Sequence, residues 1–266
     1  MYSDFHIHSH HSFDSEQDSS EIIKKCIELN MKEMCFTDHN DFNWPIVGEN
    51  ADLNVKEYFN ELSDLRDRYS KDINVNIGVE CGLSDANVSL NRNLISSNPF
   101  DFVIGSCHEV DNMDPYYPEF FEGKTDRQAF ERYFETLSKC VEDFDNFDVV
   151  GHIDYIVRYS PNKAENYSPA DYSDYIDHIL KTVISRGKGI EINTSALSKG
   201  FGFTNPCSEI IKRYKDLGGE IITIGSDAHK ACFIGCAFDK AGDILKEIGF
   251  EYYTVFSGRK PLFRKL

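Results

Sequence analysis

Short apolar segments alternate with longer amphipathic segments along most of the chain. Segments rich in β-forming apolar residues lie at 3–8, 33–39, 75–81, 101–108, 147–154, 188–195 and 220–227. Between them, apolar residues recur at helical spacing over 19–30, 55–70, 126–144, 169–185 and 206–217. Strand-length segments that alternate with helices in this way predict a repeated β-α unit.

The number of predicted strands favours a closed barrel. A doubly wound sheet usually carries a glycine-rich nucleotide loop after its first strand, whereas histidines follow the first strand here. We therefore predict a TIM-like parallel α/β barrel that forms a single domain over residues 1–266. An open α/β sheet is the alternative, because periodicity alone does not separate the two architectures.

Composition adds limits on where this protein works. Of the 266 residues, 41% are hydrophobic and 27% are charged, and no apolar run approaches the roughly 20 residues of a membrane helix. The first residues, MYSDFHIH, resemble no secretion signal, so we expect no membrane association and a cytoplasmic location. The eight cysteines form no C-x-x-C pair and are expected to be free thiols, with Cys81 and Cys107 in the core.

The net charge of -17 disfavours negatively charged partners. Nucleic acid is disfavoured, because its binding depends on clustered Lys and Arg that neutralise phosphates. A small phosphate ester would meet the same repulsion unless the site had a strong local source of positive charge. Bound metal ions are the expected source.

Metal-ligand residue types recur where the predicted strands end. His6 and His8 lie two apart on the first strand, so their side chains share one face and can converge on one cation. In a parallel barrel the carboxyl ends of all strands meet at one face, so residues far apart in sequence become neighbours there. The later strands end at His39, Glu80, His108, His152, Asp227 and His229. The sequence therefore predicts a metal site at that face.

Hydrogen-bonded core or cap histidines are the ordinary alternative to metal ligands. Six of the nine histidines, however, lie at predicted strand ends, and His10, His11 and His178 lie elsewhere. That distribution favours the metal site. Asp38, His10 and His11 are neighbours of the ligands, and for them a supporting contact to a ligand and a solvated turn are both open.

The sequence resembles the polymerase and histidinol phosphatase (PHP) family in the motifs HIHSHHSFD, TDHN, GVE, GSCH, GHID and SDAH. The resemblance implies a distorted (β/α)7 barrel with three metal ions. It implies one metal held by His6, His8, Glu80 and Asp227, a second held by Glu80, His108 and His152, and a third held by Asp14, His39 and His229. Imidazole and carboxylate ligands suit zinc, manganese or iron, without choosing among the three.

Such a centre would carry its own positive charge. Three divalent ions with three carboxylate ligands leave about +3, which would attract a phosphate group into an acidic protein. The expected mechanism is in-line attack of a metal-bridging hydroxide on phosphorus, with no protein nucleophile. Asp227, His229 and a metal-bound water are the candidate proton donors to the leaving oxygen.

Longer stretches look like those of the monofunctional histidinol-phosphate phosphatases of this family: IGSCHEVDNMDPYYPEFFEG, GHIDYIVRY, EINTSALSKG and GGEIITIGSDAHK. That resemblance implies L-histidinol phosphate as the substrate, hydrolysed in histidine biosynthesis. It also implies Arg158 as a phosphate contact, because a guanidinium can bind two phosphate oxygens. Lys199 stands near Ser198, where the resemblance leads us to expect an arginine, and Trp44 is a candidate cover for the substrate ring.

Two other functions stay open. A PHP-family phosphoesterase that acts on another small phosphate ester would keep the metal ligands and change the contacts around Arg158. A non-catalytic, metal-binding regulatory module is an alternative of a different class, because the family also contains inactive domains. The complete set of ligand positions favours an enzyme over that module.

Overall fold

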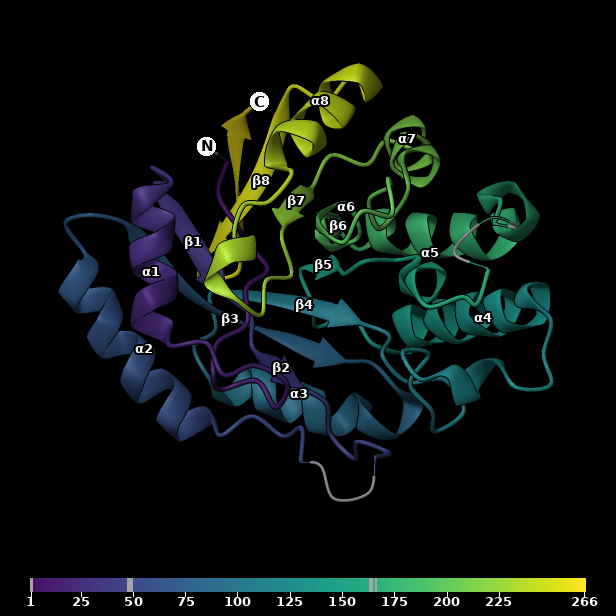
Figure 1. The fold of residues 1–266 in the computed structure, drawn as a ribbon, viewed down its shortest axis with the longest axis horizontal. Coiled ribbons are helices and arrows are strands. Elements are labelled where there is room, and N and C mark those ends of the chain that lie inside the picture. Colours follow the sequence, from purple (N-terminus) through teal and green to yellow (C-terminus); the bar gives the residue numbers. More distant parts are fainter. Residues whose placement is uncertain (1, 47–49, 163–164, 166) are drawn as a thin grey trace.

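A curled parallel sheet forms the centre of the molecule (Figure 1). The computed structural model describes residues 2–46, 50–162, 165 and 167–266. Neighbouring strands in the sheet run in the order β1-β3-β4-β5-β6-β7, β2 also pairs with β3, and every pairing is parallel. The strands are β1 Glu33–Phe36, β2 His39–Asn40, β3 Asn74–Gly82, β4 Phe102–Ser106, β5 Val149–Val150, β6 Gly189–Asn193 and β7 Ile222–Gly225.

The N-terminal segment 4–8 completes the barrel between β7 and β1. The N–H of Phe5 donates to the Ile224 carbonyl at 3.0 Å, and the N–H of Thr37 donates to the Ile7 carbonyl at 2.9 Å. The N–H of Ile7 donates to a side-chain oxygen, Thr37 Oγ1, at 3.1 Å, instead of to a backbone carbonyl of a neighbouring strand. The expected first strand is therefore an extended segment with isolated bridges, because side chains interrupt its ladder. The predicted distorted α/β barrel is confirmed.

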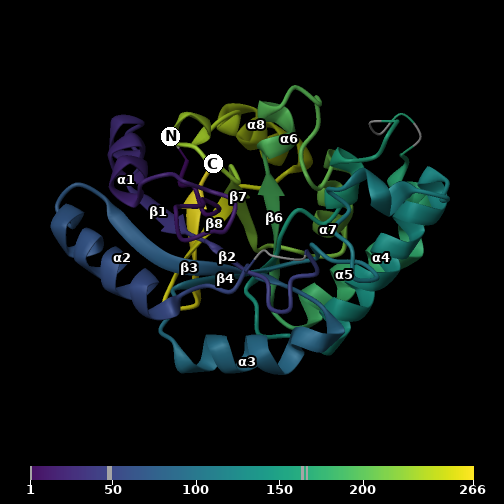
Figure 2. The same cartoon turned by 60° about the horizontal axis from the view of Figure 1, so that its bottom comes forward.

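Helices surround the sheet, as the turned view shows (Figure 2). In the part of the chain that the structure describes, they are α1 Ser19–Glu28, α2 Val55–Tyr69, α3 Val88–Ser97, α4 Asp126–Asp143, α5 Ser173–Ser185, α6 Ser195–Ser198, α7 Ser208–Asp216 and α8 Phe238–Ile248. The five predicted helices are all present. The fourth begins as a 3-10 turn, Pro169–Tyr172, and continues as α5.

Local sequence accounts for the long helix α4. Thr125 and Gln128 form a capping box, which satisfies backbone N–H groups that the first turn leaves free. Phe130, Phe134 and Leu137 recur at helical spacing and are fully buried. Burial of each such side chain stabilises the fold by about 1.5–3 kcal/mol, so this helix is held mainly by its apolar face.

Elements that the sequence analysis did not predict include α3, α8 and an antiparallel hairpin. The helix α3 is rich in Ser and Asn, whose side chains compete with the helix for backbone hydrogen bonds. The hairpin joins β8 Tyr252–Ser257 to β9 Lys260–Lys265. Gly258 and Arg259, in the turn between the two strands, both have positive φ. Asn-Gly or Asp-Gly is the usual sequence at such a turn, so Arg259 gave little indication of the hairpin.

Two expectations from composition can be compared with the structure. Cys81 and Cys107 are buried, and all eight cysteines are free thiols. Among the described residues, no helix is both long enough and apolar enough to cross a membrane.

Candidate metal centre

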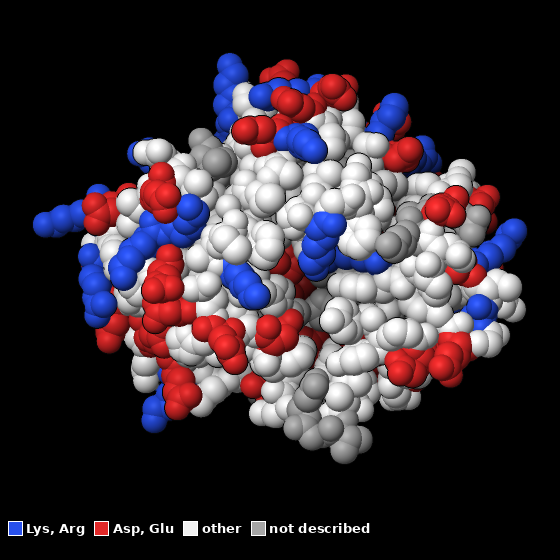
Figure 3. Space-filling view, viewed as in Figure 1, with Lys and Arg blue, Asp and Glu red and all other residues white. Residues whose placement is uncertain are grey.

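A cavity of about 670 Å³ opens at the carboxyl ends of the parallel strands. Figure 3 shows a hollow near the middle of the molecule's face, with acidic atoms inside it and basic side chains at its edge. Of the metal ligands and substrate contacts proposed from the sequence, all but His6 and His8 line the cavity, and these two contact Glu80. The proposed residues that line it are Asp14, His39, Trp44, Glu80, His108, His152, Arg158, Lys199, Asp227 and His229.

Glu80 of β3 is a fully buried carboxylate at the centre of the cluster. Its Oε2 lies 3.1 Å from His6 Nε2 and 3.5 Å from His8 Nε2. Asp227 completes this group, because its Oδ1 lies 3.8 Å from His6 Nε2 and 3.4 Å from His8 Nε2. The structure thus brings together the first predicted group of ligands.

The other carboxylate oxygen of Glu80 faces a second group. Oε1 lies 2.9 Å from His152 Nε2 and 3.3 Å from His108 Nε2, and the two nitrogens are 3.4 Å apart. Each histidine stands two residues beyond the end of its strand, β4 or β5. Glu80 therefore lies between two groups of imidazoles, which is the position expected of a bridging carboxylate.

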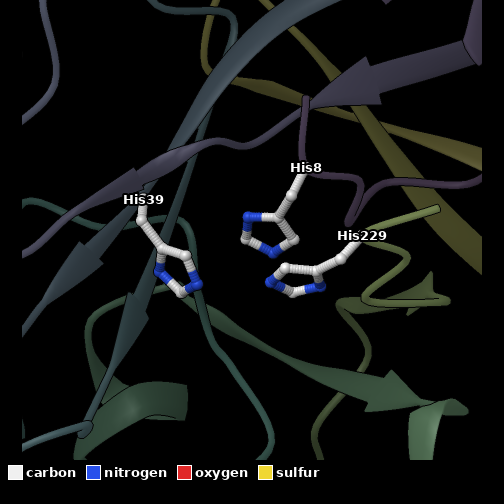
Figure 4. Close-up of side chains that lie close together, drawn as sticks. All are labelled: His8, His39 and His229. Carbon is white, nitrogen blue, oxygen red and sulfur yellow. The ribbon is translucent and has the colours of Figure 1, made fainter. Parts of the chain in front are cut away.

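A third group lies nearer the cavity mouth. Asp14 Oδ2 lies 2.8 Å from His229 Nε2 and 3.7 Å from His39 Nε2. The ring of His8 stacks against both imidazoles, with centroid separations of 4.3 Å to His39 and 4.1 Å to His229 (Figure 4). These rings come from the N-terminal segment, from β2 and from the loop after β7, so only the closed barrel joins them.

Several buried ligand-type atoms in this cluster make no hydrogen bond. They include His6 Nε2, His8 Nε2, His39 Nδ1 and Glu80 Oε2. Leaving such an atom unpaired normally costs about 1–3 kcal/mol. The three nitrogens lie 3.1, 3.5 and 3.2 Å from Glu80 Oε2. Ligands that stand ~2.1 Å from a tetrahedral zinc ion are separated by about 3.4 Å, so these side chains fit a divalent transition metal.

Burial and neighbouring charges shift the pKa values of the side chains in this cluster. Although burial opposes it, the carboxylates of Glu191 and Glu80 raise the pKa of His6 well above its usual range. Burial lowers the pKa of His8 to about 3. Despite its burial, Glu80 has a pKa well below the usual range because His6 and His108 lie beside it. Because a metal ligand must be deprotonated, a metal ion would compete with protons for His6.

Glu191 of β6 is a buried carboxylate that the sequence analysis missed. Its Oε1 lies 2.6 Å from His6 Nδ1, and its Oε2 accepts from the N–H of His152 at 3.0 Å. These contacts set which nitrogen of His6 faces the cluster. Gly225 leaves the space for this pair, since a Cβ there would overlap Glu191 Oε1 and the His6 Cβ. The alternation of apolar and polar residues in GIEIN was the available signal, because alternate residues face a barrel interior.

Two aspartates of the TDHND segment support the imidazoles. Asp38 accepts from Ser12 Oγ at 2.9 Å, and Ser12 Oγ lies 3.0 Å from His8 Nδ1. Asp38 is fully buried rather than part of a solvated turn, and its side chain reaches the proposed ligand His8 through Ser12. Asp41, which the sequence analysis did not name, lies with its Oδ1 2.8 Å from His108 Nδ1. Both carboxylates orient rings toward the cavity.

Arg158 is buried at the wall of the cavity, with 4% of its surface exposed. Its guanidinium donates to Asp227 Oδ2 at 2.9 Å, and to the side-chain carbonyls of Asn205 and Asn193 at 2.6 and 2.7 Å. A guanidinium has five N–H groups, so N–H groups remain for a ligand in the cavity.

The backbone of Asp227 has a φ of 55°, a left-handed conformation that is uncommon for residues other than glycine. Such conformations concentrate at functional sites.

The mouth of the cavity is partly aromatic, and its residues range from the exposed Lys199 to the buried Asp114. Trp44 packs against Phe13 with ring centroids 5.4 Å apart. Lys199 is exposed and follows α6 directly. Asp114 accepts from the hydroxyl of Tyr155 at 3.2 Å, and burial raises the pKa of Asp114 to about 6.

A parallel α/β barrel with imidazole and carboxylate clusters at its strand ends defines a class of metal-binding proteins. The family model of the PHP domain matches residues 4–195. The histidinol-phosphatase of Lactococcus lactis is 34% identical over 97% of this chain and 95% of its own. A probable histidinol-phosphatase of Clostridium acetobutylicum is 34% identical over 91% of this chain and 91% of its own. The chain therefore belongs to the PHP family.

A solved structure extends this similarity to three dimensions. The histidinol phosphate phosphatase of Lactococcus lactis, in complex with zinc, L-histidinol and phosphate, matches with a TM-score of 0.91 and 34% identity. The match covers 98% of this chain and 100% of that one. The relative therefore shares the barrel over its whole length.

Proposed function

We propose that this protein is a metal-dependent phosphomonoesterase that hydrolyses L-histidinol phosphate to L-histidinol and phosphate. One observation carries the proposal. The complete predicted ligand set converges on a single cavity, in a chain 34% identical over nearly its whole length to an enzyme that binds zinc, L-histidinol and phosphate. The reaction would belong to histidine biosynthesis.

The three groups of side chains would hold three divalent ions. Glu80 would bridge the group of His6, His8 and Asp227 to the group of His108 and His152, and Asp14, His39 and His229 would hold the third ion. The zinc bound by the relative favours zinc here, with manganese and iron as the other candidates. When bound, the ions would supply a hydrolytic nucleophile and neutralise the phosphoryl oxygens.

Arg158 and Lys199 would orient the phosphate. The remaining N–H groups of Arg158 can donate to phosphate oxygens while its contact with Asp227 holds the guanidinium in place. Lys199 lines the same cavity and supplies a second positive charge from the mouth. A lysine makes a point contact rather than a paired one, so we expect Lys199 to contribute less than Arg158.

The remaining walls suit the other end of L-histidinol phosphate. Aromatic residues, including Phe13, Trp44 and Tyr155, line the cavity and offer faces to an imidazole ring. Asp114 lines the same cavity and offers a carboxylate to an ammonium group. This combination of aromatic and acidic walls favours histidinol phosphate over sugar phosphates.

The leaving oxygen must receive a proton. Despite burial, His6 and His8 keep the pKa of Asp227 well below its usual range, so this carboxylate is ionised. Asp227 is therefore better suited to accept a proton than to donate one. His229 would be neutral as a ligand of the third ion, so neither of these two side chains is a strong proton donor while the metals are bound.

The test is phosphate release from L-histidinol phosphate by metal-loaded protein. We expect chelation to abolish turnover and added zinc to restore it, and hydrolysis in water labelled with heavy oxygen should place the label in phosphate. Equal turnover of unrelated phosphomonoesters would support a different phosphoesterase of the family. A full metal complement without turnover of any ester would support the non-catalytic module.

A further inference from the structure

His10 and His11 lie outside the catalytic cavity and face a different element. The Nε2 atom of each lies 3.2 Å from Glu61 Oε2 on α2. None of these residues lines the catalytic cavity. They line a separate hollow that they share with Asp52 and Glu57, and the two hollows have no lining residue in common.

A tight turn presents the two imidazoles together. The N–H of Ser12 donates to the Ser9 carbonyl at 3.0 Å, so His10 and His11 are the central residues of a β-turn. Asp38 fixes the turn from inside, because its Oδ1 accepts from the N–H groups of Ser9 and Ser12 at 2.6 and 3.1 Å. The two rings lie 4.4 Å apart between centroids. The turn therefore places the two imidazoles beside each other.

The two distances from the imidazoles to Glu61 match a coordination shell. Two ligand atoms that each stand ~2.1 Å from a tetrahedral zinc ion are about 3.4 Å apart. Both nitrogen-to-oxygen distances to Glu61 are 3.2 Å, and all three ligand atoms lie within 4.8 Å of one another. Two imidazoles and one carboxylate form a ligand set that zinc takes with water in its fourth position.

The charge around the cluster favours a cation. Asp52, Glu57 and Glu61 bring three carboxylates to the hollow, and among its described lining residues there is no Lys or Arg. Acidic side chains gather over the side of the molecule that α2 covers, at the lower left of Figure 3. The side chains of His10 and Glu61 are 40% and 35% exposed, so an ion can enter directly from solvent.

We propose that His10, His11 and Glu61 form a further binding site for a divalent transition metal of the zinc type, separate from the catalytic centre. A metal bound there ties the turn 9–12 to α2. The same turn lies between His8 and Asp14, so the ion steadies the loop that carries both. The site has three protein ligands and is open to solvent, so it binds metal reversibly and more weakly than the buried centre.

The test measures zinc stoichiometry on the metal-loaded protein by equilibrium dialysis against a series of free zinc concentrations. We expect His10→Ala and Glu61→Gln each to bind one zinc fewer than wild type, or to bind it at least about 10-fold more weakly. Turnover of L-histidinol phosphate should be unchanged in both variants. Added zinc should raise the melting temperature of the loaded wild type further than that of either variant.

His178→Ala is the matched control. His178 is exposed on α5 with its Nε2 3.8 Å from Glu142 Oε2, so it pairs with a carboxylate without a second imidazole. Its removal should leave the zinc stoichiometry unchanged. His11 is avoided as a test position, because its side chain is 8% exposed and packs edge-on against Tyr58. Equal zinc binding by wild type, His10→Ala and Glu61→Gln would overturn the proposal, as would an equal loss in His178→Ala.

Discussion

The floor and the rim of the catalytic cavity are built differently. We define the floor as His6, His8, Glu80, His108 and His152, and the rim as Asp14, Trp44, Asp114, Arg158 and Lys199. Every floor side chain is buried at or just beyond the end of an extended segment of the barrel. The rim includes exposed loop residues, such as Asp14 with 38% of its side chain exposed.

Charged side chains are held in one orientation in the floor, whereas the rim tolerates a change of charged residue type. In the floor, buried carboxylates such as Glu191 hold the imidazoles in one orientation, as a preorganised metal centre requires. At the rim, Lys199 stands where the family resemblance suggests an arginine, and the fold accommodates it at an exposed position. We therefore expect floor substitutions to affect metal binding and rim substitutions to affect substrate binding or local stability.

The largest expected effect is that of Glu80→Gln. Glutamine keeps the shape of the side chain but removes the charge that both imidazole groups share. Loss of metal-assisted charge stabilisation is worth several kcal/mol. We expect kcat/KM to fall by about 10³-fold or more, together with a lower metal content measured by elemental analysis. Circular dichroism should show the fold intact, and a variant with full metal content and turnover would contradict the floor assignment.

Arg158→Ala tests a buried residue of the rim. It removes a partner from Asp227 and two asparagines as well as the proposed phosphate contact. Breaking a buried ion pair costs about 3 kcal/mol or more, so the melting temperature should fall and KM should rise. Arg158→Lys is the control that keeps the charge but loses the paired geometry. A wild-type KM in both variants would show that Arg158 acts in stability alone.

Asp114→Asn tests a rim carboxylate whose pKa is raised, whereas the pKa of the floor carboxylate Glu80 is lowered. Burial raises the pKa of Asp114 from 3.8 to about 6, so the folded state binds this proton more tightly than the unfolded state. The stabilising contribution is complete below pH 3.8 and is lost as pH rises through about 6. Above that range the ionised group costs about 3 kcal/mol. The substitution should therefore stabilise the metal-depleted protein near neutral pH.

Urea denaturation at two pH values measures this effect. The advantage of Asp114→Asn should disappear near the lower end of the range, where the wild-type carboxyl is protonated. A difference between the proteins that is the same at both pH values would contradict the raised pKa of Asp114.

Glu191→Gln should have a smaller effect, which we expect in the zinc affinity of the floor. The variant keeps an oxygen near His6 Nδ1 but loses the negative charge that orients the ring and strengthens it as a ligand. Loss of such a supporting contact typically costs about 10–100-fold in metal affinity. Competition with a zinc chelator measures the affinity, and turnover at saturating zinc should be close to wild type. Unchanged zinc affinity would show that Glu191 has only a packing role.

Lys199→Ala should give the smallest effect. An exposed charge contact is worth at most about 1 kcal/mol, which corresponds to roughly fivefold in KM. Steady-state kinetics with L-histidinol phosphate should show that increase with little change in kcat, and Lys199→Arg should reverse it. A large fall in kcat would place Lys199 with the floor residues instead.

The sequence by itself determined most of the barrel and the residue types at its strand ends. Strand alternation and the meeting of carboxyl ends at one face are properties of local pattern and topology, so Glu80 and His152 could be predicted as neighbours. The same pattern could not show that segment 4–8 would lose its regular ladder to side chains such as Thr37.

Only the tertiary structure decided which groups support the proposed ligands. Glu191 lies 185 residues from His6, and Arg158 meets Asn205 across 47 residues, so neither pairing leaves a signal in local spacing. His10 and His11, for which the sequence left both a supporting contact and a solvated turn open, meet Glu61 on α2, 50 residues away from His11. Hydrogen bonds and coordination act over about 2–3.5 Å. Such distances between remote residues are set by the packing of the whole barrel.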